Sequence, residues 1–141
     1  MNKGWIMENR KCIAVLTEKP SLDYQSGILK GIYRSAFSHD VNVAVFCVTS
    51  TRSDEAYQIG EMVIFSLLGD YSRFSGVIYL PDTIDYSMRD TLITEKLIAA
   101  SRKIKIPVVT IDGNYDEFPC FLSDDSEPIQ FLVDHLSAGH G

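Results

Sequence analysis

Residues 12–16 read Cys-Ile-Ala-Val-Leu, a continuous apolar run that ends at a polar stretch before Pro20. Such a run is typical of a strand that is buried on both faces, as in a parallel sheet. From Tyr24 to Phe37 the apolar residues recur three and four positions apart, which predicts an amphipathic helix. A buried strand followed by an amphipathic helix is the repeating unit of α/β proteins, so this stretch decides the fold class.

The same unit recurs along the rest of the chain. Short apolar runs predict four further strands, over residues 41–48, 76–80, 107–112 and 119–123. Apolar stripes predict three further helices, over residues 54–67, 86–103 and 126–136. The last of these helices is expected to face inward with Ile129, Leu132, Val133 and Leu136. The pattern predicts a three-layer, doubly wound, Rossmann-like α/β fold, with helices on both faces of a mostly parallel five-stranded sheet in order 2-1-3-4-5.

Length and charge favour one domain that does not contact nucleic acid directly. The chain has 141 residues, close to the commonest domain size, and we divide it into an N-terminal extension, 1–10, and one domain, 11–141. The 13 Lys and Arg against 19 Asp and Glu give a net charge of −6. An acidic surface repels phosphate backbones, and no basic block interleaved with aromatics occurs, so nucleic acid is not an expected partner.

The cysteines favour a reducing compartment. There are three, Cys12, Cys47 and Cys120, each within an apolar run and without Cys-x-x-Cys spacing. We expect buried, reduced thiols and a cytoplasmic location. The sequence has no apolar stretch of the length that a signal peptide or a transmembrane helix needs, so no membrane association is predicted.

Motifs for common chemistries are missing from the sequence. The turn after the first strand has no glycine, which argues against a dinucleotide site. Only Asp82 stands where a phosphorelay receiver would need an acid, and Asp124 and Asp125 are interpreted as solvated acids. The histidines lack metal-ligand spacing, and no Gly-x-Ser-x-Gly elbow occurs. We therefore predict no catalytic residue, no metal, no cofactor and no enzymatic activity.

Five short motifs follow one another along the chain, four of them at or beside predicted strands and one in the first predicted helix. They are Ile-Ala-Val-Leu-Thr at 13–17, Gly-Ile-Leu-Lys-Gly-Ile at 27–32, Phe-Ser-Gly-Val-Ile-Tyr-Leu at 74–80, Pro-Val-Val-Thr-Ile-Asp at 107–112 and Ser-Asp-Asp at 123–125. His135-Leu136 and Gly139-His140 follow at matching spacing. In this order the motifs resemble the ligand-binding module of LacI/GalR-type regulators, the cytoplasmic relatives of periplasmic binding proteins.

The resemblance implies that the chain is the first lobe of a two-lobed module. The resemblance covers nearly the whole chain from Lys11. Members of the family also have a second lobe and a helix-turn-helix before the first lobe, so we expect this chain to be a piece of a longer regulator. Two positions depart from the family pattern. Where the family has Asn-Pro-Phe-Phe, this chain retains one aromatic, Tyr24, and where the family often has Asp-Arg, it has Asp112-Gly113 and loses the guanidinium.

The leading hypothesis is a ligand-sensing domain. A small polar molecule, sugar-like or nucleoside-like, would bind between this lobe and a second lobe and shift an attached output. The output would be DNA binding, or a nucleotide-signalling module such as a nucleotide cyclase, or a kinase module. The expected ligand-binding residues all stand at carboxyl ends of predicted strands: Glu18, Tyr24, Asp82 and Asp112.

The alternative is a protein-interaction domain that keeps the fold without binding a ligand. Its surface would lie on the first helix, at Gly27, Gly31, Tyr33 and Phe37. Under both hypotheses we expect a homodimer, because apolar surface near Leu136 and an uncovered sheet edge invite pairing.

Overall fold

The structure, a computed structural model, describes residues 10–48, 71–83, 88–113 and 115–139. The helix expected over 54–67 and nearly all of the N-terminal extension lie outside these ranges. Within them, no helix has both the length and the apolar character needed to cross a membrane.

A five-stranded parallel sheet forms the centre of the fold, with strands in the order β2-β1-β3-β4-β5. The strands are Cys12–Glu18 (β1), Asn42–Val48 (β2), Gly76–Tyr79 (β3), Val108–Ile111 (β4) and Cys120–Phe121 (β5). The predicted strand order and parallel direction are confirmed. Since all strands run the same way, their carboxyl ends share one edge of the sheet, and polar residues that follow different strands are brought together there.

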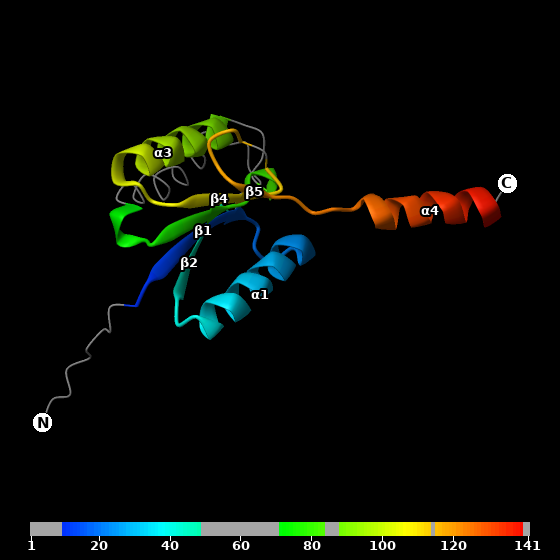
Figure 1. Ribbon diagram of the computed structural model, residues 1–141, viewed down its shortest axis with the longest axis horizontal. Helices are drawn as coiled ribbons and strands as arrows, with labels where there is room; N and C mark the ends of the chain where they lie inside the picture. The colour runs from blue at the N-terminus through cyan, green and yellow to red at the C-terminus, as the bar shows by residue number, and fades with distance from the viewer. Residues whose placement is uncertain (1–9, 49–70, 84–87, 114, 140–141) are drawn as a thin grey trace, which may run out of the picture.

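The face of the sheet covered by α3 (Met88–Ile104) holds the larger core (Figure 1). Ile93 and Leu97 of α3 pack with buried side chains of β1, β3 and β4. Tyr71, in the short helix η1 (Tyr71–Arg73), belongs to the same cluster. Burial raises the pKa of the Tyr71 phenol to about 12, since its ionised form would lose hydration there.

The opposite face is covered by α1 (Asp23–Ser38), as the doubly wound pattern predicted (Figure 1). Leu29 packs with Val15 and Leu80 in a smaller core cluster. Gly27 and Gly31 do not approach the sheet, because a Cβ built on either would meet nothing within 4 Å. Their spacing therefore marks an open side of α1 rather than a contact with the strands.

The three cysteines are free, and each is mostly covered without being fully buried. Cys12 opens β1 and Cys120 lies in the two-residue edge strand β5, where few neighbours cover a side chain. The free thiols and their mostly covered positions agree with the expectation of reduced, largely buried cysteines.

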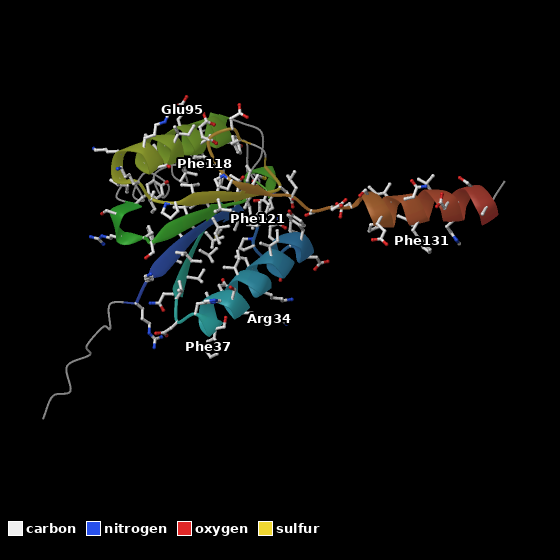
Figure 2. The ribbon with its side chains drawn as sticks, viewed as in Figure 1. Arg34, Phe37, Glu95, Phe118, Phe121 and Phe131 are labelled. Carbon is white, nitrogen blue, oxygen red and sulfur yellow. The ribbon has the colours of Figure 1, made fainter. Side chains whose placement is uncertain are left out.

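The last helix, α4 (Ser126–Gly139), departs most from the sequence-based expectation. It forms where the periodicity predicted it, but it stands apart from the sheet at the end of an extended segment (Figure 1). Every residue from Ser126 to Ala138 is exposed. The predicted inward face is wrong, because Ile129, Leu132, Val133 and Leu136 are all more than half exposed. Figure 2 shows that Phe131, another exposed apolar residue of α4, is likewise remote from the core.

Candidate functional site

The carboxyl ends of β4 and β5 bring two polar residues together. The strands pair in register as Thr110 with Cys120 and Ile111 with Phe121. Asp112 therefore follows the end of β4 beside the segment that leaves β5 at Ser123. The Asp112 amide donates a hydrogen bond to the carbonyl of Phe121 at 2.8 Å, which extends the ladder by one step and fixes Asp112 at the sheet edge.

Asp112 is the centre of a hydrogen-bonded group that we name the Asp112 cluster: Tyr24, Asp112 and Ser123. The Ser123 amide donates to Asp112 Oδ1 at 2.6 Å, and the Ser123 hydroxyl donates to Oδ2 at 2.7 Å. The Tyr24 hydroxyl also donates to Oδ2. Tyr24 comes from the first turn of α1, so the cluster joins three segments that are distant in sequence. Tyr24 as a whole residue remains 46% exposed, so part of its side chain faces solvent.

The carboxyl of Asp112 is held in its ionised form. Partial burial raises its pKa, but the hydrogen bonds from the Tyr24 hydroxyl and from the Ser123 amide and hydroxyl lower it by more. The pKa of Asp112 therefore lies below its ordinary value, because all three donors favour the charged state. At neutral pH the cluster presents a carboxylate to its surroundings.

The backbone around Asp112 is shaped for a close approach to the end of β3. Asp112 has φ of 55°, a left-handed conformation that aspartate tolerates better than most residues. The buried Thr110 hydroxyl donates to the carbonyl of Gly113 at 2.7 Å and holds this turn closed. A Cβ at Gly113 would lie 1.8 Å from Cγ of Pro81, so only glycine lets this turn lie against the short helix η2, Pro81–Thr83.

Glu18, at the carboxyl end of β1, is 2% exposed. Its carboxylate pairs with Lys19, Oε1 to Nζ, at 2.8 Å. Its amide donates to the Thr83 hydroxyl at 3.1 Å, and that hydroxyl donates onward to the carbonyl of Leu80 at 2.7 Å. Thr83 therefore fixes η2 against the end of β1. The backbone amide of Glu18 therefore joins the end of β1 to η2, while its carboxylate is covered and paired with Lys19.

The four residues expected to bind a ligand fare differently in the structure. Tyr24 and Asp112 are in direct contact, while Glu18 lies at the end of β1 on the same edge of the sheet. Asp82 lies in η2, and its side chain falls outside what the structure describes.

Sequence reasoning did not name Ser123 or Thr83 among the ligand-binding residues. The role of Ser123 could have been predicted from the sequence. Ser123 and Asp112 stand at the ends of two successive predicted strands, and a serine hydroxyl can donate to a carboxylate there. The role of Thr83 could not have been predicted in this way, since its partner Glu18 is remote in sequence.

Two surface hollows lie away from this edge. They flank the C-terminal half of α1, and Val41 contributes to both. One, of about 460 Å³, is mainly apolar and includes Ile13, Ile32 and Ile78. The other, of about 530 Å³, includes Tyr33 and Phe37. Both are near the amino ends of β1 and β2, so they are separate from the Asp112 cluster.

The parallel sheet in the order β2-β1-β3-β4-β5, with helices on both faces, places this chain in the class of doubly wound α/β folds. No family model matches the sequence, and no curated protein matches it significantly. Solved structures do match. The LacI family transcriptional regulator CCPA from Weissella paramesenteroides with bound glucose aligns with a TM-score of 0.58 and 20% identity, over 90% of this chain and 42% of its own. The same regulator with bound sucrose gives a TM-score of 0.62 at 18% identity.

The lac repressor dimer bound to operator and the anti-inducer ONPF aligns with a TM-score of 0.63 and 19% identity, over 95% of this chain and 43% of its own. The chain therefore has the fold of LacI-family regulators, as its motifs predicted. It spans less than half the length of these neighbours, which is consistent with a single lobe of a ligand-binding domain.

Proposed function

We propose that this chain is a ligand-sensing lobe that binds a small polar molecule, sugar-like or nucleoside-like, at the edge formed by Tyr24 and Asp112. The observation that carries the proposal is the Asp112 cluster, in which a half-exposed tyrosine and a carboxylate meet at the carboxyl edge of a parallel sheet. In open α/β sheets this edge is where ligands bind. Neighbours of the same fold were solved with glucose and sucrose bound, which supports a polar effector.

Each site residue has a distinct task in this proposal. The ring of the half-exposed Tyr24 packs against a flat face of the ligand, and the carboxylate of Asp112 accepts hydrogen bonds from its hydroxyl or amino groups. Glu18 and Thr83 hold the end of β1 and η2 in place, which sets the position of Asp82 in η2 beside the ligand. A second lobe supplies the opposite wall of the cleft.

The response is regulatory rather than catalytic. Closure of the cleft around the ligand shifts an attached output between two states, either DNA binding or a nucleotide-signalling or kinase module in the cytoplasm. The neighbours are transcriptional regulators, which favours the first output. A homodimer of lobes transmits the shift, in keeping with the lac repressor dimer among the neighbours.

The proposal is tested by following backbone amide chemical shifts while glucose, sucrose or adenosine is added at millimolar concentration. One wall of a cleft makes few of the contacts, so binding is expected to be weak, with Kd of about 1 mM or weaker. Shifts should concentrate at Tyr24 and Asp112, and Tyr24→Ala should abolish them. Tyr33→Ala, on the same helix, is the matched control.

Two outcomes would contradict the proposal. Shifts confined to the hollows beside α1 would move the site elsewhere. Submicromolar binding to this chain alone would show that no second wall is needed.

A second candidate function, protein interaction through α1, is favoured by one observation. Phe37 is 90% exposed, and Figure 2 shows it near the C-terminal end of α1, whereas Tyr24 lies in the first turn of that helix. Tyr33 is also exposed, and a Cβ built on Gly27 or Gly31 would meet nothing within 4 Å. If α1 is the interface, Phe37→Asp should lower the mass found by light scattering toward the monomer mass of 15.8 kDa. Ala99→Asp adds the same charge at an exposed position of α3, on the opposite face of the sheet, and should leave the wild-type mass unchanged.

A further inference from the structure

We infer that Asp112 is a positioning residue that couples the ligand-binding edge to the orientation of α4. The inference rests on the proposed function, because it concerns how binding at that edge is regulated and transmitted. It is carried by the Asp112 cluster, in which one carboxylate holds both a site residue, Tyr24, and the segment that leads to α4, at Ser123.

The first step concerns how many bonds the Asp112 carboxylate accepts. Its two oxygens offer about four lone-pair positions. Three donors within the chain use three of these positions, since Ser123 binds through its amide and its hydroxyl and Tyr24 through its hydroxyl, and one position is left. A ligand that donates two hydrogen bonds to Asp112 must therefore replace one of these donors. The Tyr24 hydroxyl is the one to be replaced, because Tyr24 is half exposed and its side chain is held to Asp112 by a single bond.

The second step concerns what Ser123 controls. Only Asp124 and Asp125 separate it from the first residue of α4. Asp124 accepts a hydrogen bond from the amide of Ser126 at 3.1 Å and another from the Ser126 hydroxyl. The bond from the Ser126 hydroxyl, and to a lesser extent the bond from its amide, lowers the pKa of Asp124. Both bonds favour the ionised carboxylate. Since every residue of α4 from Ser126 to Ala138 is exposed, the direction of the helix is set at Ser123 and Asp124.

The third step joins the two ends. Tyr24 and the Ser123 hydroxyl share the same oxygen, Oδ2. A ligand hydroxyl that takes the place of Tyr24 redistributes the bonds on that oxygen and changes the hold on Ser123. The orientation of α4 thus becomes sensitive to occupancy of the edge. Such coupling between groups in one hydrogen-bonded network has a free energy that can be measured.

The coupling is tested first without ligand, by hydrogen exchange and NMR on the whole chain. Tyr24→Phe removes only the hydroxyl and keeps the ring. We expect it to raise the pKa of Asp112, because a donor to the carboxylate is lost, and to speed exchange of the Ser123 amide about threefold or more. Residual dipolar couplings should show α4 sampling a broader range of orientations. Tyr33→Phe, which removes an exposed hydroxyl from the same helix, should change none of these quantities.

Ser123→Ala tests the same link from the other end. It should raise the pKa of Asp112 and broaden the orientations of α4 while leaving the dispersion of amide signals from β1 and β3 intact. If Tyr24→Phe leaves the Ser123 amide and α4 unchanged, the inference is wrong.

A ligand arm separates this inference from the proposed function. Glucose and sucrose are added at millimolar concentration to the wild-type chain and to Tyr24→Phe. Binding at the edge that leaves Ser123 and α4 unchanged overturns the inference while the proposed function stands. A response of Ser123 to Tyr24→Phe, with no binding of either sugar to any residue of the edge, supports the coupling and counts against the proposed sugar-like ligand.

Discussion

Helices α3 and α4 carry the same kind of apolar stripe, yet only α3 has a surface to pack on. Leu97 of α3 is 0% exposed, whereas Leu132 of α4 is 56% exposed. The difference lies in how each helix is connected. Since α3 lies between β3 and β4, the right-handed crossover rule fixes the sheet face that it covers. The rule does not act on α4, which follows β5 and lies between no two of the described strands. The periodicity of apolar residues thus identifies the apolar face of a helix, but it does not identify the surface on which that face packs.

The largest expected effect is on stability, and it separates the two helices directly. Leu97→Ala leaves a cavity in the core on the α3 face and should lower the free energy of unfolding by about 2–5 kcal/mol. Leu132→Ala removes the same atoms from an exposed site and should change it by less than about 0.5 kcal/mol. Urea unfolding followed by circular dichroism provides the measurement. Equal losses for the two variants would mean that α4 packs as firmly as α3 does.

A second effect concerns association through the unpartnered stripe of α4. Leu136→Asp places a charge within that stripe and should raise the dissociation constant of a homodimer by at least about tenfold. Ala138→Asp adds the same charge on the other side of the helix and is the control. Light scattering at several concentrations, compared with the monomer mass of 15.8 kDa, gives the result. A wild-type chain that stays monomeric well above micromolar concentration would show that neither α4 nor the sheet edge is a self-association surface.

The smallest effect is expected at the Asp112 cluster, which joins the two regions. The pKa of Asp112 is lowered in the folded state, so the stability that it contributes is present above its unfolded pKa of about 3.9. This contribution is lost as pH falls through the lower folded pKa. Asp112→Asn removes it, so unfolding free energy should depend less steeply on acid pH in this variant than in wild type. Asp116→Asn, in the exposed segment after β4, is the matched control. Identical pH profiles for wild type and Asp112→Asn would contradict the lowered pKa.

Much of the fold could be predicted from the sequence because local and global signals agree there. The run at 12–16 is apolar enough to be buried on both sides, and the crossover rule orders the strands once their helices are known. The candidate site was only partly predictable. The position of Asp112 at a strand end was readable, but its bonds to Tyr24 and Ser123 depend on side-chain geometry across three segments. The burial of Glu18 was not readable either, since its hydrogen-bond partner Thr83 is distant in sequence.

The order of the sheet also has a consequence for handling this protein. Strand β2 is the outermost strand on its side of the described sheet, and its residues 43–48 read Val-Ala-Val-Phe-Cys-Val, without a charge, proline or glycine. Six-residue segments of this composition favour cross-β stacking when they are released from the native sheet. Partial unfolding that frees β2 would therefore seed fibrils. Asn42→Lys, at the exposed position directly before this segment, adds a gatekeeper charge that would slow their growth.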